Sequence, residues 1–564
     1  METQRTVATF AMKPRQFNTS CHLAQPFRQG PYRSWMWRRR QAVLRCRQTH
    51  QRPAGTHGDP DEAVINCRLG KNPAGFHPSI WGDFFLHYSN PIASSPQLQV
   101  RMAERADKLK EEVATMIDRS STCSLLERLH LIHVLQLLCL DHLFEDAIND
   151  LLTQIRHTDV SGCDLQTVAL WFYLLRYHGY RVSPDVFIKF KDGVERFSSN
   201  DPRGLLNLYN AAFLMTPGER ILDEAMSHSR KCLEQALGHM DREGSLSREI
   251  IRALNIPLPR RVRIYEAKYY ISIYEKETTV HETVLELAKL NSNLMQLHHQ
   301  QELKVITRWW KNLRLQSNLS FSRDRIVECY FWMLGAYFEP RYSRARIFLT
   351  MVMAIITIMD DTYDVYGTSE ECELLTKCIE SWNPEVAKNL PENLKIILQN
   401  ILHSYEIIEH ELDPGCKYRL SYLKNVTIDW VRAYNTEVEW RDRRYIPTTV
   451  EEHLQNSVRS GACHLLTCAS FIGMDDIATK ESFDWVTSMP NSVHSLCIIL
   501  RLLDDLNSYE WLKSNKDQPK ELLARIFNLA RTMEFFYEQD DAYTNSYIVK
   551  DIINSTFVDS FTVF

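Results

Sequence analysis

The stretch from residue 347 to 367, IFLTMVMAIITIMDDTYDVYG, decides the fold class and carries the first functional signal. Its first thirteen residues have no charge, and three carboxylates, Asp360, Asp361 and Asp364, then fall within five positions. A helix that spans a membrane needs about 20 apolar residues, so the uncharged run is too short to cross a bilayer. We therefore predict a helix that is buried inside a globular protein and ends in a group of acids.

Helical periodicity extends over most of the chain. In residues 125–155, apolar residues recur three and four apart with charges between them, which is typical of amphipathic helices packed face to face. Pro and Gly interrupt the pattern at 199–203, 257–259 and 412–415, where we expect helices to end. Because 564 residues exceed the roughly 300 at which a single core stops growing, the sequence predicts an all-α protein of two domains, divided near residues 256–285.

Charge and cysteine usage exclude several classes of function. Residues 1–58 hold ten Arg and one Lys against a single acid, although the whole chain has a net charge of −5, so the body is acidic and a poor nucleic-acid binder. We interpret this basic start either as an organelle-targeting peptide or as a disordered tail. The 14 cysteines form no C-x-x-C pair, which argues against a zinc or thioredoxin-like site and favours reduced thiols.

The acids at the end of the buried helix indicate a cation. In one continuous α-helix over residues 347–366, Asp360 and Asp364 share a face and Asp361 is turned aside by about 100°. Like charges on one face repel, and acids at a helix C-terminus oppose the macrodipole, so the arrangement is costly without a cation. Mg²⁺ is held by one or two carboxylates together with water and substrate phosphates. The alternative is a solvated acidic helix end.

A second cluster follows another apolar helix, in RLLDDLNSYEWLK from residue 501. Asp504 and Ser508 are again four apart, and Arg501 lies three residues before Asp504 on the same face. A carboxylate, a hydroxyl and a guanidinium together suit a metal ion that is bridged to a phosphate, because Arg grips phosphate oxygens in a planar fork. The alternative is a surface face of salt bridges.

Two further arginines, Arg323 and Arg325, precede an aromatic stretch, IVECYFWMLGAYF. Alone, R-x-R is typical of a solvated helix. Beside the two acidic clusters, which suit metal ions, these arginines would bind phosphate. The aromatic rings that follow them would contact an apolar group of the same ligand. The rings belong to Tyr330, Phe331, Trp332 and Tyr337.

These segments resemble plant terpene synthases of the class I type, most closely the sesquiterpene synthases of grasses. The resemblance covers roughly residues 76–564 and rests on ordered motifs: FHPSIWGDFF, RWWK, RDRIVECYFWMLGAYFEPRYSRAR, DDTYD, TVEEHLQNSVRSGACHLL and RLLDDLNSYE. It implies two helical domains, an N-terminal α-barrel (61–270) without chemistry of its own and a C-terminal class I bundle (271–564) that holds the site. Residues 1–60 are expected to be a tail.

The resemblance also implies an activity and residue roles. The expected enzyme is a Mg²⁺-dependent lyase that ionises and cyclises a prenyl diphosphate and releases diphosphate, with three Mg²⁺ ions, or Mn²⁺ in their place. Asp360 and Asp364 are expected to bind two ions with Asp361 in support, and Asp504 and Ser508 a third. Arg323, Arg325 and Arg501 are expected to hold the diphosphate, and Trp332 to face the carbocation. Tyr537, Asp541 and Tyr543 are expected to assist the final proton loss.

The chain departs from the family pattern after the second cluster. The family has Glu four positions after the Ser or Thr, whereas residue 512 is Leu. Several tens of residues that the family carries are also missing between Glu510 and Trp511. We expect a weakened third metal site and a cavity without some of its walls, and therefore an enzyme that is impaired or inactive.

A second departure concerns the substrate. Many relatives carry Arg-Arg ten and nine residues before the Trp of the front motif, and these positions are Lys71 and Asn72 here. The change favours farnesyl diphosphate and a cytoplasmic enzyme. The alternatives are a plastid monoterpene synthase acting on geranyl diphosphate, which the basic tail favours, and a non-catalytic helical protein that binds a prenyl diphosphate without turnover. We expect a monomer that neither binds nucleic acid nor spans a membrane.

Overall fold

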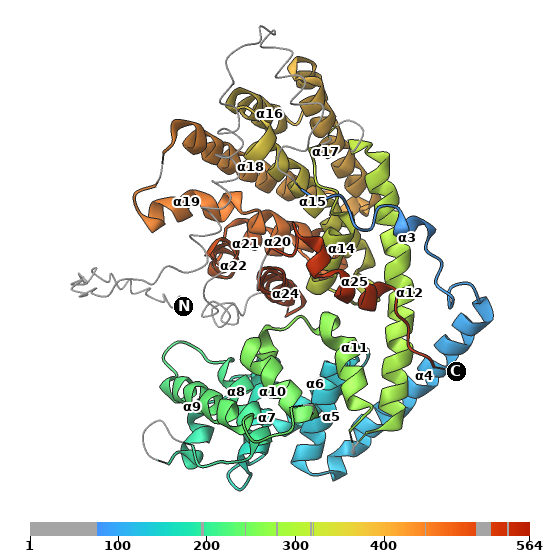
Figure 1. Ribbon diagram of the computed structural model, residues 1–564, viewed down its shortest axis with the longest axis vertical. Helices are drawn as coiled ribbons and strands as arrows, with labels where there is room; N and C mark the ends of the chain where they lie inside the picture. Colours follow the sequence, from blue (N-terminus) through green and yellow to red (C-terminus); the bar gives the residue numbers. More distant parts are fainter. Residues whose placement is uncertain are drawn as a thin grey trace, which may run out of the picture. The chain divides into compact units, whose positions relative to one another are not determined.

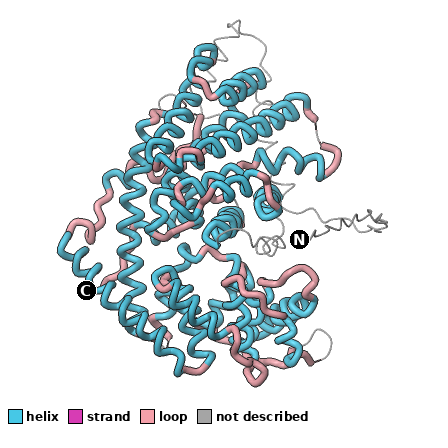
Figure 2. Tube along the Cα trace, turned by 180° about the vertical axis from the view of Figure 1, so that it is seen from behind, coloured by secondary structure: helices cyan, strands magenta, loops and turns pink. Residues whose placement is uncertain are grey.

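The computed structural model describes residues 76–563 except 193–196, 243, 278–279, 316–318, 320, 446, 503–519 and 539–540. Within these residues the regular elements are helices, joined by turns and loops, and the only β pairing is an isolated bridge between Lys191 and Phe197 (Figure 2). The prediction of an all-α protein is confirmed.

The front half consists of amphipathic helices that pack around an apolar core. They are α3 (Phe84–His87), α4 (Pro96–Arg119), α5 (Leu125–Leu137), α6 (Glu145–Ile155), α7 (Leu165–Tyr177), α8 (Pro202–Ala212), α9 (Arg220–Ala236), α10 (Ser245–Asn255) and α11 (Arg263–Tyr274). Short 3₁₀ turns lie at Ser120–Thr122, Asp141–Leu143, Pro184–Phe190 and Leu258–Arg260.

Local capping explains where these helices begin. The side chain of Ser124 and that of Glu127 form a reciprocal capping box at the start of α5. Asp201 accepts hydrogen bonds from the first turn of α8, and Pro202 occupies the first position of that helix. The Pro-containing stretch at 199–203 therefore sets the start of a helix, and residues 125–155 form two helices as the periodicity predicts.

The rear half contains the longer and more deeply buried helices. They are α14 (Ile326–Ala336), α15 (Ser343–Asp361), α16 (Ser369–Ser381), α17 (Glu392–Glu411), α18 (Arg419–Arg443), α19 (Val450–Ser460), α20 (Cys463–Ile472), α21 (Lys480–Thr487), α22 (Asn491–Leu502), α24 (Lys520–Tyr537) and α25 (Lys550–Phe557). Short 3₁₀ turns lie at Pro340–Tyr342, Pro384–Asn389, Pro414–Cys416, Asp475–Ile477 and Ser546–Ile548, and a π-helical turn at Thr362–Tyr366.

One long helix, α12 (Glu282–Asn312), takes part in both halves (Figure 1). Leu287 and Leu290 near its start belong to the core that the front helices share. Leu303 and Ile306, farther along, belong to the core of the rear helices. The single helix therefore supplies apolar side chains to two different cores.

The division of the chain near residues 256–285 stays a prediction. The described residues of the front and rear halves belong to one compact unit. Helix α11, which lies inside the predicted boundary, packs against α5 and α12 as well as against α14 and α25.

Helix α15 is the buried helix that the opening stretch predicts. Among the described residues, Pro340–Tyr366 is the one helical stretch whose length and apolar composition would suffice to cross a membrane, and 83% of its apolar window is buried inside the protein. Neighbouring helices α14, α17 and α20 pack against α15. Its apolar composition is therefore that of a core helix.

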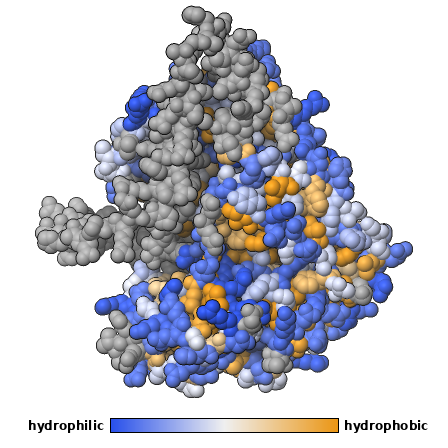
Figure 3. Space-filling view, viewed as in Figure 1, coloured by the Kyte–Doolittle hydropathy of each residue, from blue (hydrophilic) through white to orange (hydrophobic). Residues whose placement is uncertain are grey.

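The surface is mixed in polarity. In Figure 3, hydrophilic side chains (blue) cover much of the coloured surface, and hydrophobic ones (orange) gather in patches between them. The exposed large apolar side chains include Phe84, Val100, Ile188 and Ile251. Scattered apolar residues of this kind are ordinary on globular proteins.

Candidate active site

The acidic motif lies where α15 ends. The α-helix stops at Asp361, and Thr362–Tyr366 form a π-helical turn in which the Gly367 N–H donates to the Thr362 carbonyl over 2.7 Å. The helix therefore continues to Tyr366, but its last turn is π-helical, so the α-helical spacing that would place Asp360 and Asp364 on one face ends at Asp361. The Thr362 hydroxyl donates to the carbonyl of Ile358 over 2.7 Å, a side-chain bond that competes with the helix ladder and bends helices.

The first two acids share one arginine. The Arg323 guanidinium lies 2.5 Å from Oδ2 of Asp360 and 2.7 Å from Oδ1 of Asp361, and its backbone N–H donates to Oδ2 of Asp361 over 2.7 Å. The hydroxyl of Tyr434, on α18, donates to Oδ1 of Asp360. Asp361 is buried, whereas Asp360 and Asp364 are partly exposed. The structure thus brings one predicted diphosphate ligand onto two predicted metal ligands.

The environment of Asp361 favours a nearby cation. Burial raises the pKa of Asp361 to about 6, the charge of Arg323 opposes this rise, and the neighbouring Asp360 adds to it. Two crowded carboxylates raise one another's pKa, and a cation between them relieves the repulsion.

Arg325 has different partners from Arg323. It is buried, and its guanidinium donates to the carbonyls of Asp324 (2.9 Å), His77 (2.9 Å) and Thr544 (3.1 Å). It therefore connects the segment at residue 77 to the segment at residue 544, and these contacts are with backbone rather than with the acids.

The same two segments also meet Arg323. The ring of Phe76 lies 4.7 Å from the guanidinium carbon of Arg323, and the hydroxyl of Thr544 accepts from its Nη1 over 3.0 Å. Sequence reasoning quoted Phe76 as part of a motif but assigned neither Phe76 nor Thr544 to the site. Because both are distant from residue 323 in the chain, local pattern could not have paired them.

Trp332 belongs to an aromatic cluster between α14 and α24. Its ring stacks on Phe536 with centroids 4.5 Å apart and planes at 13°, and it meets Tyr543 and Tyr537 edge to face at 5.5 and 5.9 Å. The helices approach closely because residue 335 is glycine, where a Cβ atom would lie 2.1 Å from Cγ2 of Thr532. Three of the predicted aromatic residues are thus brought together.

Tyr543 connects the aromatic cluster to the charged one. Its ring lies 5.8 Å from the Arg323 guanidinium carbon, and its hydroxyl contacts Thr357 on α15 and Sγ of Cys329, the latter at 3.1 Å. Asp541 accepts from the backbone N–H groups of Tyr543 (3.1 Å) and Thr544 (2.9 Å). Its carboxylate therefore shapes the turn that presents Tyr543.

The second predicted metal cluster lies outside the described residues. This applies to Asp504 and Ser508 and to the junction at Glu510, Trp511 and Leu512. Arg501 lies near the end of α22, which packs against α19, α20 and α24, but its side chain is outside the description.

The donor chemistry of the acidic motif fits a hard divalent ion. In the part of the chain that the structure describes, no group of three or more His, Cys, Asp or Glu forms a metal cluster, and the cysteines are free thiols. Asp360 and Asp364 supply oxygen only, and two carboxylates suffice for Mg²⁺ when water and phosphate complete the shell. Because Arg323 and Tyr434 contact both oxygens of Asp360, an ion there competes with the guanidinium.

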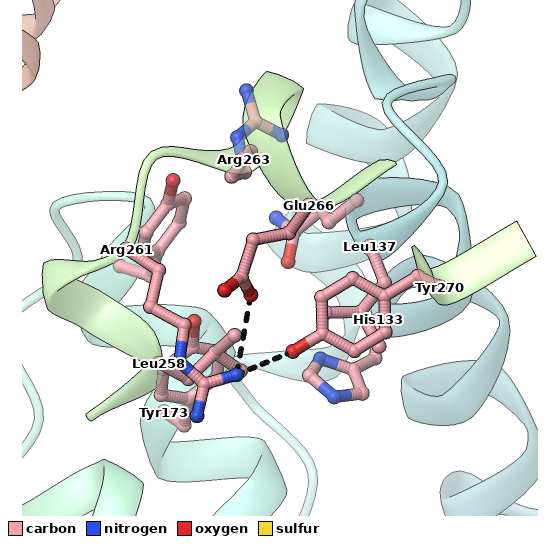
Figure 4. A pocket seen from close by; sticks show the side chains of 10 residues that line it. His133, Leu137, Tyr173, Leu258, Arg261, Arg263, Glu266 and Tyr270 are labelled. Atoms are coloured by element: carbon pink, nitrogen blue, oxygen red, sulfur yellow. Dashed lines mark hydrogen bonds and ion pairs between the residues drawn. The ribbon is translucent and has the colours of Figure 1, made fainter. Parts of the chain in front are cut away.

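A small cavity lies elsewhere, among α5, α7 and α11, and both charged and apolar side chains line it (Figure 4). Its volume of about 20 Å³ suits a single water molecule. Arg261 donates to Tyr270 (2.7 Å) and Glu266 (3.3 Å) at its edge, and burial lowers the pKa of His133 to about 3. This cavity is too small for a prenyl chain.

Comparison with known proteins identifies the family. Residues 80–254 match the "Terpene synthase, N-terminal domain" and residues 311–522 the "Terpene synthase family, metal binding domain". Alpha-terpineol synthase, chloroplastic, of Zea mays is 55% identical over 88% of this chain and 87% of its own length. The chain belongs to the terpene synthase family. It is thereby related to lyases that cyclise prenyl diphosphates, and its metal-binding domain implies a divalent cofactor.

Other terpene synthases extend the comparison. Zingiberene synthase of Sorghum bicolor is 41% identical over 88% of this chain and 98% of its own, which confirms the resemblance to grass sesquiterpene synthases. A limonene synthase structure with 2-fluorolinalyl diphosphate has a TM-score of 0.81 at 28% identity, covering 86% of this chain and 99% of its own. Isoprene synthase of grey poplar, in complex with three Mg²⁺ ions and dimethylallyl-S-thiolodiphosphate, has a TM-score of 0.77 at 27% identity, covering 82% and 98%. The expected barrel and class I bundle are confirmed.

The alignment with alpha-terpineol synthase also shows a difference in length. The alignment is 544 residues long. Only 88% of this 564-residue chain takes part in it, which is fewer residues than the alignment contains. The relative therefore has residues within the aligned range that have no counterpart in this terpene synthase.

Proposed function

We propose that this terpene synthase ionises a prenyl diphosphate at the acidic end of α15 and holds the prenyl chain against the Trp332 cluster. The observation that carries the proposal is the position of Tyr543. Its ring centroid lies 5.8 Å from the guanidinium carbon of Arg323 and 5.5 Å from the ring centroid of Trp332, so Tyr543 contacts both groups. The cationic and the aromatic parts of a class I site are therefore adjacent.

The carboxylates, the arginine and the aromatic rings of the site have different roles in the proposed reaction. Mg²⁺, which Asp360 and Asp364 would hold, supplies positive charge that stabilises the leaving diphosphate. Arg323 is the protein cation next to these carboxylates and is placed to accept the diphosphate when an ion takes over the acids. The π faces of the Trp332 and Tyr543 rings would stabilise an allylic cation, and the apolar rings would keep water away.

The number of ions depends on the second cluster. The grey poplar isoprene synthase structure contains three Mg²⁺ ions. By analogy, we assign Asp360, Asp361 and Asp364 to two ions and Asp504 and Ser508 to a third, which Leu512 leaves one ligand short of the family pattern.

Two observations bear on the substrate and point in different directions. Lys71 and Asn72 replace an arginine pair and favour farnesyl diphosphate in the cytoplasm. The 55% identity to a chloroplastic alpha-terpineol synthase, together with the basic tail, supports geranyl diphosphate in plastids. Because the identity extends over most of the chain, we place geranyl diphosphate first and farnesyl diphosphate second.

A second candidate function is binding without turnover. Leu512 and the residues that the relative has but this chain lacks support it. Without the missing segment, water would enter a cavity in which a carbocation has to survive.

Product analysis tests these proposals. Purified full-length chain is incubated with geranyl or farnesyl diphosphate and Mg²⁺, and terpenes and released diphosphate are measured, with Asp360→Asn/Asp364→Asn as the inactive control. A matched chain carries the corresponding segment of alpha-terpineol synthase between Glu510 and Trp511.

Three outcomes discriminate. Efficient turnover by the unaltered chain contradicts impairment. Turnover only by the extended chain supports an impaired synthase. Failure of both chains to turn over or to bind either diphosphate with Mg²⁺ contradicts the proposed function.

A further inference from the structure

Arg441, on α18, holds the π turn that follows Asp361. Its Nη1 donates to the carbonyls of Tyr363 (2.7 Å) and Asp364 (3.2 Å), and its Nη2 donates to the carbonyl of Gly367 (3.4 Å). Its Nε donates to Asp442 over 3.0 Å. One guanidinium therefore contacts the backbone inside the turn and at the residue that follows it.

The turn needs such a donor because of how it ends. Gly367 is extended, with φ −74° and ψ 141°, so the helix stops and its last carbonyls lack a following turn of N–H groups. The C-terminus of α15 also carries the negative end of the macrodipole and three carboxylates. A cation that donates to its carbonyls meets both requirements.

Helix α16 also packs against the turn, where the hydroxyl of Tyr363 donates to the carbonyl of Cys372 over 3.3 Å. A Cβ atom at Gly367 would lie 2.7 Å from Sγ of Cys372 and 3.0 Å from the carbonyl oxygen of Thr362. The turn therefore contacts both α16 and the guanidinium of Arg441. The main-chain carbonyl of Asp364, which lies inside the turn, is held by Arg441.

We propose that Arg441 is a positioning residue for the metal site: it fixes the backbone of Asp364 and so sets how the Asp364 and Asp360 carboxylates are placed to share a divalent ion. The inference rests on the proposed function, because it presumes that these two acids bind the ion. Arg441 contacts only the backbone of the turn and the side chain of Asp442 among the groups described above, so its effect on the ion is indirect. Tyr434, seven residues earlier on the same face of α18, contacts the Asp360 side chain directly.

Mn²⁺ binding to the full-length chain, followed by electron paramagnetic resonance, tests the role without requiring turnover. Arg441→Gln removes the charge and the fork, and Arg441→Lys keeps the charge but loses the fork. The matched control is Arg432→Gln on the same helix, because Arg432 pairs at 2.5 Å with Glu380 and is away from the turn.

Outer-shell residues of metal sites typically change affinity by about 10–100-fold when they are substituted. We expect Arg441→Gln to weaken Mn²⁺ binding by a factor in that range and Arg441→Lys to remain weaker than the unaltered chain by about tenfold. Arg432→Gln should bind as the unaltered chain does. The line width of bound Mn²⁺ should differ between the Arg441 variants and the unaltered chain. A loss of fold stability alone would not change this line width.

The possible outcomes distinguish a failure of the role of Arg441 from a failure of the proposed metal site at Asp360 and Asp364. If the unaltered chain binds no Mn²⁺, or if Asp360→Asn leaves binding intact, the proposed metal site is overturned and the inference with it. If Asp360→Asn abolishes binding but both folded Arg441 variants bind as the unaltered chain does, the inference alone is overturned. Should Arg441→Gln fail to fold, Arg441→Lys decides the question.

Discussion

Two arginine–carboxylate clusters lie at opposite ends of α15 and differ in access. Arg346, in the first turn of the helix, pairs with Glu302 of α12, and the two side chains are 0% and 4% exposed. Arg323 pairs with Asp360 and Asp361 at the last turn, and the Asp360 side chain is 22% exposed. The chemistry of the two clusters is the same, but only the second admits a ligand.

The Arg346 cluster is saturated. Arg346 donates to both oxygens of Glu302 at 2.8 and 2.6 Å and to the carbonyls of Tyr337 and Glu339 at 2.9 and 3.2 Å. Tyr330 donates to Glu302 at 2.8 Å. Although burial alone would raise the pKa of Glu302, hydrogen bonds and the charge of Arg346 hold it well below its usual range. The cluster stabilises the packing of α12, α14 and α15.

The Arg323 cluster retains freedom to exchange partners. Asp361 is buried with its pKa raised to about 6, while Asp360 and Asp364 reach the surface. The comparison teaches that a buried ion pair indicates function only where one partner can be released to a ligand. Three predictions test this distinction and one concerns the buried acid Glu328; they run from the largest effect on folding to the smallest.

Arg346→Met should destabilise the fold most. The substitution leaves the buried Glu302 carboxylate with only His298 and Tyr330 as partners, and breaking a buried ion pair costs about 3–5 kcal/mol. Urea denaturation measures the change. Arg341→Gln is the matched control, because Arg341 pairs with Glu145 where both side chains are nearly half exposed, and it should change stability by less than about 1 kcal/mol. Equal effects would remove the distinction between closed and open pairs.

Glu328→Gln should change how stability depends on pH. Burial raises the pKa of Glu328 from its ordinary 4.5 to about 7, against opposing hydrogen bonds and the charge of Arg325. The folded protein therefore holds this proton more tightly than the unfolded chain, and that stabilisation is lost as pH rises through 7. From pH 4.5 to 8 the unaltered chain should lose about 3 kcal/mol relative to the variant. Parallel pH profiles of the urea midpoint would contradict this.

Arg323→Gln should have a smaller effect on folding than Arg346→Met. It leaves the Asp361 carboxyl buried without its guanidinium, which costs about 1–3 kcal/mol, and Asp361 can relieve the cost by taking up a proton. Binding of pyrophosphate with Mg²⁺ should be lost. Urea denaturation and isothermal calorimetry measure the two effects, and intact pyrophosphate binding would contradict the assigned role.

Asp360→Asn should change the free energy of unfolding by no more than about 1 kcal/mol, because the side chain is partly exposed. We expect Mg²⁺ and pyrophosphate to raise the melting temperature of the unaltered chain, and this stabilisation should disappear in the variant. Asp484→Asn, a distant acid on α21 that accepts from Tyr422, is the control. A retained Mg²⁺ response in the Asp360 variant would place the ion elsewhere.

Much of the fold follows from local pattern. The uncharged run 347–359 correctly predicts a buried helix, and the periodicity of 125–155 correctly predicts packed helices, because both signals depend on neighbours a few residues apart. The π turn at Thr362–Tyr366 was missed. It depends on a threonine hydroxyl and on packing against α16, which a continuous helical pattern does not reveal.

The site residues could be predicted only where several charged residues lie close together in the sequence. The acids of α15 and the arginines before α14 are visible as unusual clusters, and the structure places Arg323 on two of those acids. Tyr434 and Arg441 were not predicted, because on α18 they look like ordinary residues of an amphipathic helix, and their partners lie more than seventy positions away. Roles for Asp504, Ser508 and Arg501 stay predictions.

The passage of α12 through both cores has a practical consequence for dissecting the molecule. A fragment that begins after this helix would strip the rear bundle of Leu303 and Ile306, and one that includes the whole helix would leave Leu287 and Leu290 bare to water. Either fragment should aggregate or unfold at a lower temperature than the intact protein, so the site is best studied in the full-length chain.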